Sequence, residues 1–560
     1  MLIDNSKVKN FKLIEFLKEN ALMVFTIGFL VTIVYLNSIN NEFVSDDIFG
    51  IVNNKIIGTW EYLKQGTRTY PSRLITHTIS YQLGGRNPVF FRLPIIITHF
   101  LNTTLVFVIL SIFKKKNFGF LAAILFAVHP LLTEPVIWIS AGSYVYTTLF
   151  FLLSFLYYII ETKTNRILSI LFFLVALSFS AFSACLPFIL LLYEFSNNKL
   201  RRNWKKTIPY FTILFIAGFS FIAMLKFRVS SLSADHNQAA NFRNPLIHIP
   251  SIISTYLELF LWPQNLTLYH SDVGFSMFGY STIFFNSTAF VMKTVVFLMF
   301  VVGMILSYFK DKFIFFWLGF FAIAIAITLV PLSIVWTVAE RYVYLASIGL
   351  FVVFVQILWK LFKNNRENLY ILIFVFAIIL GVRTIVRNSN WKTADDLWLS
   401  SAEISPTSPQ NHNNLGDLYR RKGDLARAKY EFETAIQLKP TYADAMHNLA
   451  ATYLLTGDSE NAKILFEKSI EFKPTLWQSH LHLANIYIAE NDIENAEAYI
   501  LKSVQLNQQN PEALATYAVI ESKKGNEEKA NQLIQAALRL DPNNPFVLRI
   551  INRANQNQPK

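Results

Sequence analysis

Two adjacent acidic residues, Asp46 and Asp47, stand in the stretch NEFVSDD, directly after the first long apolar run of the chain. Carboxylates can take a proton from a substrate or bind a cation. Two like charges side by side can also raise the pKa of one of them. Outside any special context, a pair of aspartates in a loop is more often a solvated turn or a helix cap. The context of this pair therefore decides whether it predicts chemistry.

The composition predicts a membrane protein with a smaller polar part. Of the 560 residues, 53% are hydrophobic and 52 are Phe, and the mean hydropathy is +0.37. The net charge of +13 comes from the apolar part, because acidic residues slightly outnumber basic ones after residue 390. No basic cluster lies on a polar stretch, so we expect no nucleic-acid partner. Cys185 is the only cysteine, which excludes an intrachain disulfide.

Residues 1–390 are predicted to form one polytopic helical domain. A hydrophobic stretch of about 20 residues crosses a bilayer, which gives about eleven spans. The first reads as a retained anchor rather than a cleavable signal peptide. The weakest pair is a predicted hairpin at 167–196, because basic residues flank both of its ends. The expected spans lie near residues 21–39, 90–113, 117–133, 143–160, 167–183, 184–196, 207–225, 289–309, 313–330, 343–362 and 368–386.

The basic loops predict the orientation of these spans. Lysines precede the first span, Lys114, Lys115 and Lys116 follow the second, and further lysines and arginines occupy alternate loops. Because such loops stay in the cytoplasm, the N-terminus is expected there and the C-terminus outside it. The acidic pair and the segment 226–288 are then expected on the outer side. Polar groups from separate loops would converge on one face of the membrane, most simply a bacterial cytoplasmic membrane.

After residue 390 the sequence repeats with a period of 34 residues, as tetratricopeptide repeats do. We expect a half-repeat linker helix at 391–408, four repeats at 409–544 and a capping helix or tail at 545–560. Each repeat buries its apolar face only against a neighbour, so the array is predicted to be an α-solenoid that binds an extended peptide. A purely structural role is the alternative. The predicted fold class is therefore all-α. The first unit shows the pattern at Leu415, Gly416, Tyr419, Ala428, Phe432, Ala435 and Pro440.

Several short motifs, taken together and in order, resemble those of a known family. They are NEFVSDD, GGRNPVFFRL with THFLN, HPLLTEPVIWIS, LPFILLLYE, AERYVYLASIG, and RNSNWKTADDLW leading into HNNLG. The chain resembles the membrane O-mannosyltransferases with C-terminal tetratricopeptide repeats, and their bacterial relatives, within the GT-C glycosyltransferase superfamily. The resemblance covers nearly the whole chain. It implies transfer of a sugar, with mannose as the first candidate, from a polyprenyl-phosphate carrier to a protein hydroxyl outside the cytoplasm.

The resemblance places acidic residues of the first outer loop at the active centre. It implies that Asp47 is the general base, with Asp46 orienting the acceptor, or that the two roles are exchanged. Glu134 matches the acid of the family motif HPxHTE and would bind the acceptor, hold the base or help to ligate a cation. No cofactor is expected to be required, although Mg²⁺ or Mn²⁺ on Asp46, Asp47 and Glu134 is the alternative. His129 is expected to be structural.

The leaving group implied by the resemblance is a lipid phosphate, whose charge calls for a cation. Arg341, in AERYVYL, is the first candidate, followed by Arg92 and Arg73. An arginine can hold phosphate oxygens with two parallel hydrogen bonds, which a lysine cannot. The alternative for Arg341 is a residue that snorkels to the interface or pairs with its neighbour Glu340.

The chain departs from the family pattern mainly in its second outer loop. Leu132 replaces the second histidine of HPxHTE, and Gly142, Ser143 and Tyr144 stand where relatives carry charge. These departures bear on which sugar is transferred, on whether a metal is used and on whether the protein is fully active.

Two other functions stay open. One is a non-catalytic membrane scaffold that presents the repeats to partner proteins. The other is a transferase that acts on a lipid or cell-wall glycan and does not need the repeats.

Overall fold

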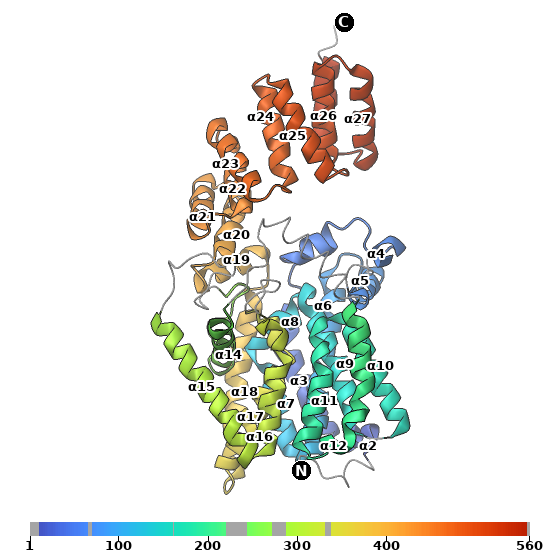
Figure 1. Ribbon diagram of the computed structural model, residues 1–560, viewed down its shortest axis with the longest axis vertical. Coiled ribbons are helices and arrows are strands. Elements are labelled where there is room, and N and C mark those ends of the chain that lie inside the picture. Colours follow the sequence, from blue (N-terminus) through green and yellow to red (C-terminus); the bar gives the residue numbers. More distant parts are fainter. Residues whose placement is uncertain are drawn as a thin grey trace. The chain divides into compact units, whose positions relative to one another are not determined.

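The computed structural model describes residues 11–64, 70–160, 162–219, 244–270, 287–330 and 338–556. Within these ranges every regular element is a helix, which confirms the all-α prediction. The described residues divide into two compact units, of which the first ends at Ser405 and the second begins at Pro406 (Figure 1). The sequence placed boundaries after residues 390 and 408, and the linker expected between them belongs to the first unit up to Ser405.

Every predicted span coincides with a helix, although residues 220–225 of the seventh lie outside the described ranges. In those ranges, six helices are long and apolar enough to cross a membrane, or seven if the bent pair Lys116–Val128 and Pro130–Ile137 is one span. The remaining apolar helices are shorter, so the number of crossings stays a prediction. The long helices of the first unit are α3 (Ala21–Tyr35), α6 (Pro88–Phe113), α7 (Lys116–Val128), α9 (Gly142–Ile159), α10 (Lys163–Phe179), α11 (Leu186–Ser196), α14 (Pro245–Leu261), α15 (Ser287–Lys310), α16 (Lys312–Ala324), α17 (Ser347–Leu361) and α18 (Arg366–Ser389).

Like the shorter α5 (Pro71–Gly84), helix α14 was not predicted from the sequence. It begins at Pro245 with its first turn capped by the Asn244 side chain, which accepts from the backbone N–H of Leu246. The sequence assigned this region to the outer segment 226–288, part of which lies outside the described residues. At 17 residues α14 falls short of a full span.

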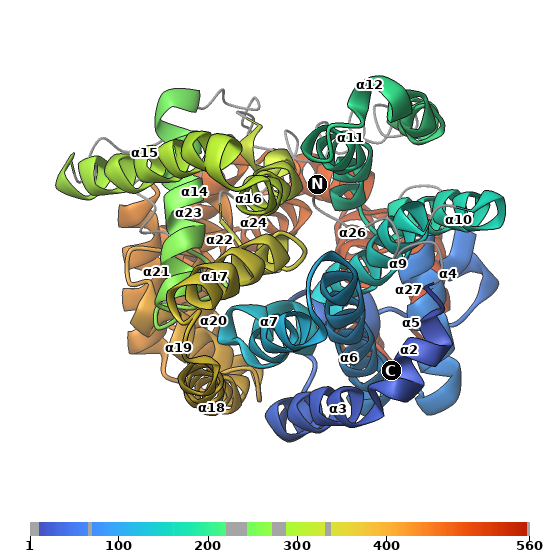
Figure 2. The ribbon, with the colours of Figure 1, turned by 90° about the horizontal axis from the view of Figure 1, so that it is seen from below.

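Helix α6 forms the centre of the first unit and packs against α3, α7 and α9 (Figure 2). Most of its side chains are buried, as expected for a helix that is apolar on all sides. Helix α15 shows the opposite arrangement, since only 6% of its most apolar 18-residue stretch is buried. Its exposed Val291, Val295 and Leu298 form an apolar surface suited to lipid. The first unit is therefore a membrane protein by the distribution of its apolar surface.

The second unit is a stack of helix pairs, as the repeat pattern predicts. Its pairs are α20 (Pro409–Arg421) with α21 (Leu425–Leu438), α22 (Ala443–Leu455) with α23 (Ser459–Phe472), α24 (Trp477–Ala489) with α25 (Ile493–Leu506), and α26 (Pro511–Lys523) with α27 (Glu527–Leu540). Buried clusters join neighbouring pairs; one contains Phe466 of the second pair and Leu483 of the third. The helix α28 (Pro545–Gln556) closes the stack, and its Val547 packs against Ala537.

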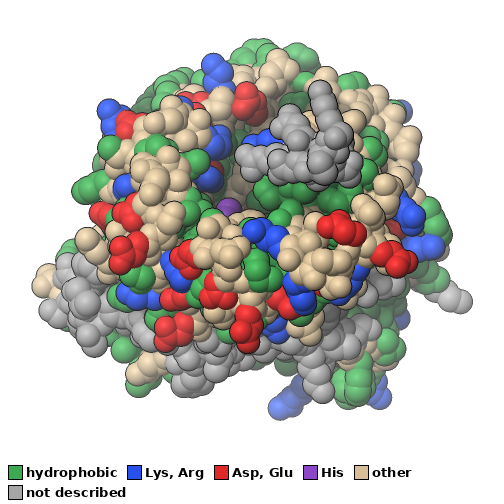
Figure 3. Space-filling model, turned by 90° about the horizontal axis from the view of Figure 1, so that it is seen from above, with side chains coloured by type: hydrophobic (Ala, Val, Ile, Leu, Met, Phe, Trp, Pro, Cys, Tyr) green, Lys and Arg blue, Asp and Glu red, His purple; other side chains and the backbone are tan. Residues whose placement is uncertain are grey.

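The turn inside each helix pair requires a left-handed backbone at the same register position. Gly423, Gly457 and Gly525 have φ values of 81°, 81° and 84°, and the third pair places Asn491 there with φ 60°. Glycine adopts this conformation without strain, and asparagine tolerates it better than most residues. On the face shown in Figure 3, acidic and basic side chains are interspersed rather than gathered by sign. Pairs such as Lys463–Glu490 join neighbouring repeats of the second unit.

Candidate functional site

The loop that follows α3 is held in place by the guanidinium group of Arg92, near the start of α6. Its Nε donates to the carbonyl of Ile137 at 2.8 Å, and Nη1 donates to the carbonyls of Ile39 and Asn41 at 3.0 and 2.6 Å. Nη2 donates to the carbonyl of Glu42 at 3.1 Å. Only 1% of Arg92 is exposed. The sequence proposed Arg92 as a phosphate ligand, but each of its nitrogens already serves a backbone carbonyl, so we assign it a positioning role.

Asp47 is the second anchor of this loop. Its Oδ1 accepts from the backbone N–H of Ser140 at 2.8 Å and from the Ser140 hydroxyl at 2.5 Å. The side chain is fully buried, and this burial raises the pKa of Asp47 to about 6, although the bonds from Ser140 and the charge of Arg92 oppose the rise. A buried carboxylate with these partners is poorly placed to meet a substrate.

Asp46 is the acid of the pair that reaches the surface, although the sequence analysis put its neighbour Asp47 first as the general base. It is exposed and begins the helical turn that continues as η2 (Ile48–Val52). The residue before it, Ser45, has a φ of 53°, a left-handed backbone conformation that is uncommon for serine. Residues in such conformations cluster at active sites and ligand-binding segments. Of the two roles that the sequence left exchangeable, burial makes Asp47 an anchor of the loop, while Asp46 is the exposed acid.

Glu134 and Arg341 form a buried ion pair between short helices that are distant in sequence. Glu134 lies in α8 (Thr133–Ile137) and Arg341 in η10 (Glu340–Val343), and Arg341 Nη1 donates to Glu134 Oε1. The guanidinium also lies over the rings of Trp138 and Tyr342, at 5.2 and 4.9 Å from their centroids. The second carboxylate oxygen, Glu134 Oε2, is buried and has no partner among the described residues. Such an atom is a candidate contact for a polar ligand.

A second buried pair lies beside the first. Arg387, at the end of α18, donates to both oxygens of Glu340 at 2.8 and 2.7 Å and to the carbonyl of Leu266. His270 Nε2 lies 3.4 Å from Glu340 Oε1. The proposed pairing of Arg341 with its neighbour Glu340 is therefore wrong, because consecutive residues of a helical turn point in different directions.

Tyr269 shows that these groups share one neighbourhood. Burial raises the pKa of the Tyr269 hydroxyl, and the negative charges of Asp46 and Glu134 raise it further. The positive charge of Arg341 lowers this pKa. Three of the residues that the sequence selected from separate loops thus act on a single hydroxyl. Tyr269, Arg387 and Ser140 were not singled out; Arg387 and Ser140 stand in motifs that carry the resemblance, but nothing in one sequence shows which residues they contact.

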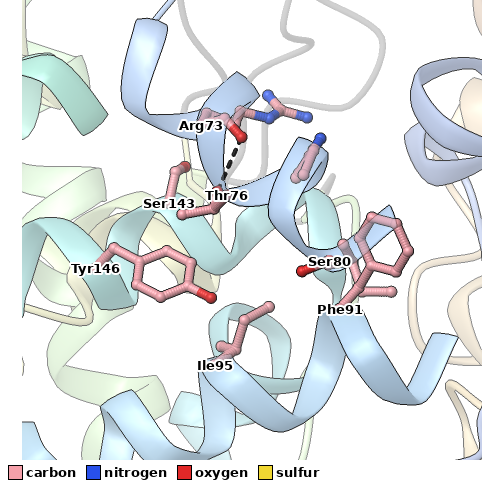
Figure 4. Close-up of a pocket in the computed structure, with 9 residues that line it drawn as sticks. Arg73, Thr76, Ser80, Phe91, Ile95, Ser143 and Tyr146 are labelled. Carbon is pink, nitrogen blue, oxygen red and sulfur yellow. Dashed lines mark hydrogen bonds between the residues drawn. The ribbon is translucent and has the colours of Figure 1, made fainter. Parts of the chain in front are cut away.

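Arg73 lies apart from these pairs, in α5 (Pro71–Gly84), and lines a small polar pocket against α6 and α9. The hydroxyls of Ser80 and Tyr146 point into this pocket, and Ser143 lies beside it (Figure 4). Among the described residues no carboxylate forms an ion pair with Arg73. The Arg73 side chain is also partly exposed, so of the three proposed arginines it is the one with neither a carboxylate partner nor a set of backbone carbonyl acceptors among the described residues.

The residues proposed for a divalent cation do not form a site. In the described part of the chain, no three His, Cys, Asp or Glu side chains gather as metal ligands would. Asp47 Oδ1 is bonded to Ser140 and Glu134 Oε1 to Arg341, so neither carboxylate has both of its oxygens available to a cation. We therefore derive no step through a metal. His129 has the structural role expected of it, since its ring contacts the N–H of Leu131 and the carbonyl of Phe260.

Comparisons with known proteins agree with the resemblance read from the sequence. Family models described as tetratricopeptide repeat match residues 407–475 and 478–510. A protein O-mannosyl-transferase of Caenorhabditis elegans is 25% identical over 72% of this chain and 61% of its own length. Protein O-mannosyl-transferase TMTC3 of Homo sapiens is 23% identical over 76% of this chain and 52% of its own length.

Shorter and weaker likenesses complete the comparison. Protein O-mannosyl-transferase TMTC1 of Homo sapiens is 34% identical, but over 22% of this chain and 16% of its own. The solved structure of YrrB, a TPR protein with an unusual peptide-binding site, is 15% identical over 35% of this chain and 97% of its own, with a TM-score of 0.24. The chain spans about half to three fifths of the length of the curated relatives that it matches over most of its own length. It is similar to protein O-mannosyl-transferases of the TMTC kind, and it carries tetratricopeptide repeats.

Proposed function

We propose that this protein transfers a sugar, with mannose as the first candidate, from a polyprenyl-phosphate carrier to a serine or threonine hydroxyl of a protein on the outer side of the membrane. The names of the relatives support a glycosyl transfer to protein. The observation that carries the proposal is the buried Glu134–Arg341 pair, in which the second carboxylate oxygen of Glu134 has no partner among the described residues.

In this proposal Asp46 is the general base. An acceptor hydroxyl is a weak nucleophile, and a carboxylate within hydrogen-bond reach takes its proton as the new glycosidic bond forms. Asp46 is exposed, while Arg92 and Asp47 hold the loop on both sides of it. A base held by buried neighbours loses little freedom when the acceptor arrives, which favours reaction.

Arginine side chains stabilise the phosphate that leaves. Negative charge grows on the carrier phosphate as its bond to the sugar breaks, and a guanidinium can share that charge. Arg73 has no carboxylate partner among the described residues, and Arg341 is paired with Glu134. We assign the phosphate to Arg73 first. Glu134 Oε2, the unpartnered oxygen, is then available to a hydroxyl of the sugar or of the acceptor.

The repeats are proposed to bind the acceptor protein. Stacked helix pairs of this kind present a curved surface to extended peptides. Polar side chains also join neighbouring pairs, as in the bond from Asn448 to Asn413 at 3.0 Å.

The test uses the full chain in lipid nanodiscs with polyprenyl-phosphate mannose and a library of Ser/Thr peptides. Asp46→Asn should lower the transfer rate by about 10²–10⁴-fold, as expected for loss of a general base. Glu42→Gln is the matched control, because Glu42 is an exposed acid of the same loop whose backbone, rather than its side chain, contacts Arg92.

The outcomes separate the competing functions. Equal rates for Asp46→Asn and Glu42→Gln would remove Asp46 as the base. Transfer to a lipid or glycan that survives deletion of residues 406–560 would mean that the acceptor is not a protein held by the repeats. A phenotype that needs the repeats and ignores Asp46 and Arg73 would identify a scaffold.

A further inference from the structure

An apolar groove opens on the side of the first unit, between two helix pairs. One wall is η6 (Ala181–Cys185) with α11, and the other is α16 with η9 (Ala326–Leu329). Its volume is about 560 Å³. The residues that matter here are Ala184, Cys185, Phe188, Leu191, Ile323 and Ile327.

One end of this groove meets the candidate site. Phe182 lines the groove and stacks on Tyr342, with ring centroids 5.0 Å apart, and meets Tyr144 edge-on at 5.2 Å. The guanidinium of Arg341 lies 4.9 Å from the Tyr342 ring centroid. A molecule in the groove that reached past Phe182 would therefore arrive beside the Glu134–Arg341 pair.

The same end of the groove is also linked to Arg73. The backbone N–H of Ala181, at the head of the groove, donates to the hydroxyl of Tyr70 at 3.3 Å. Tyr70 is the N-cap residue of α5, the helix that carries Arg73. Phe179, just before the groove, stacks on Tyr146, which lines the Arg73 pocket. Both candidate phosphate ligands thus lie near the head of this one groove.

A second apolar groove provides a contrast. It runs between α3 and α6 and has a volume of about 810 Å³, so it is the larger of the two. Its upper residues include Ile39 and Leu93. Lys18 of α2 (Leu13–Glu19) lines the opposite end of this groove. At the Ile39 end stands Arg92, whose nitrogens already bind backbone carbonyls. This second groove can accept an apolar chain, but at the end that reaches the loop after α3 it offers a phosphate no available arginine.

We propose that the groove between α11 and α16 holds the isoprenoid chain of the donor, with its phosphate at the Phe182 end. The proposal rests on the proposed function and specifies where its donor binds. Helix α11 is about 16 Å long, so the groove holds the isoprene units nearest the phosphate and the remainder lies in the bilayer. Apolar walls bind such a chain by burial, and the cations at one end fix its direction.

The single cysteine of the chain allows a direct test. Cys185 lines the groove, so a maleimide carrying a benzophenone group places a photo-cross-linker there in the native sequence. The matched control moves the cysteine to the second groove with Cys185→Ala and Thr32→Cys, since Thr32 lines that groove and is exposed. Both proteins are reconstituted in phosphatidylglycerol vesicles with radiolabelled polyprenyl monophosphate and irradiated.

We expect cross-linking of the labelled lipid from position 185 to exceed that from position 32 by about tenfold, which corresponds to about 1.4 kcal/mol. Excess unlabelled polyprenyl monophosphate should abolish the signal, and excess phosphatidylglycerol should not. Equal labelling from both positions, or labelling from position 32 alone, would overturn the proposal. So would labelling that both lipids suppress equally, because the groove would then bind any membrane lipid.

A filled groove gives an independent readout. Ala184→Trp should raise the KM for a long-chain polyprenyl-phosphate sugar about tenfold, while Val24→Trp in the second groove should leave it unchanged. If transfer occurs and only Val24→Trp raises the KM, the donor uses the other groove and the proposed function stands. If the lipid cross-links from Cys185 but no peptide is glycosylated, the groove assignment stands and the proposed function fails.

Discussion

The buried pair of Glu134 and Arg341 allows the sharpest test of how this site is built. No part of Glu134 and 9% of Arg341 is exposed. Removing one partner of a buried ion pair leaves an uncompensated charge and costs about 3–5 kcal/mol. Replacing both with neutral side chains removes the charge together with its partner and costs far less. We expect each of Glu134→Gln and Arg341→Gln to lower the free energy of unfolding of the first unit by about 3–5 kcal/mol.

The double variant should lose only about 1–2 kcal/mol, because an uncharged pair carries no desolvation penalty for an isolated ion. The coupling energy between the two positions should therefore be at least about 3 kcal/mol. The pair of Glu340 and Arg387 is the matched control, since it is equally buried and hydrogen-bonded through both oxygens. Its two singles and its double should follow the same pattern.

The assay is denaturation of the full chain in mixed detergent micelles, followed by tryptophan fluorescence. Trp477 is the one tryptophan of the chain after Ser405, so a Trp477→Phe background makes fluorescence report on the first unit alone. Additive effects of Glu134→Gln and Arg341→Gln would refute the reasoning, because they would show that the two charges do not depend on each other. Sugar transfer then separates the two pairs. The Glu134/Arg341 double variant should fold and lose transfer, whereas the Glu340/Arg387 double variant should fold and retain it.

Three further predictions follow from other parts of the fold. Burial raises the pKa of Asp47 to about 6, so the folded state binds the proton of this carboxyl group more tightly than the unfolded state does. The free energy of unfolding should therefore fall by roughly 3 kcal/mol as the pH rises from about 4 to 7. Asp47→Asn should flatten this pH dependence in the same fluorescence assay. Arg92→Lys should destabilise the first unit by about 3 kcal/mol, because an ammonium group cannot reach four backbone carbonyls as the guanidinium does. An unchanged denaturation midpoint for this variant would contradict the positioning role of Arg92. In the repeats, Gly457→Ala should lower the free energy of unfolding by about 1 kcal/mol, because φ is 81° at this position, although there is open space for the added Cβ. Asn491→Gly should lower it by less. Calorimetry of the full chain would measure both effects.

The repeats could be predicted almost completely from the sequence, because their contacts are local. Ala428 and Phe432 belong to one helix pair, and Leu449 of the next pair packs against them. The same spacing recurs in each unit, so the pattern carries the fold. The left-handed turn at Asn491 was not predicted, since asparagine breaks the run of glycines that marks this position in the other three units.

The apolar helices could also be predicted, but their partners could not. Length and hydropathy locate a helix without stating which helix it meets. Glu134 and Arg341 are 207 residues apart, and Asp47 and Ser140 are 93 residues apart. No pattern in one sequence couples such positions. The resemblance named Glu134 and Arg341 as functional residues, and only the fold showed that they neutralise each other.

The acidic pair shows most clearly what a sequence leaves open. Asp46 and Asp47 are chemically identical, and their order along the chain does not say which of them meets solvent. Consecutive residues on a helical turn point about 100° apart, so at the edge of a packed loop one faces inward and the other outward. Here the inward position belongs to Asp47, because Ser140 supplies two donors to its carboxylate. A serine in the WIS stretch thereby decides which acid of the first loop is available for the proposed role of general base. Ser140→Ala should therefore disturb transfer through Asp46, although Ser140 itself need not touch the substrate, and rescue by Ser140→Thr would support this positioning role.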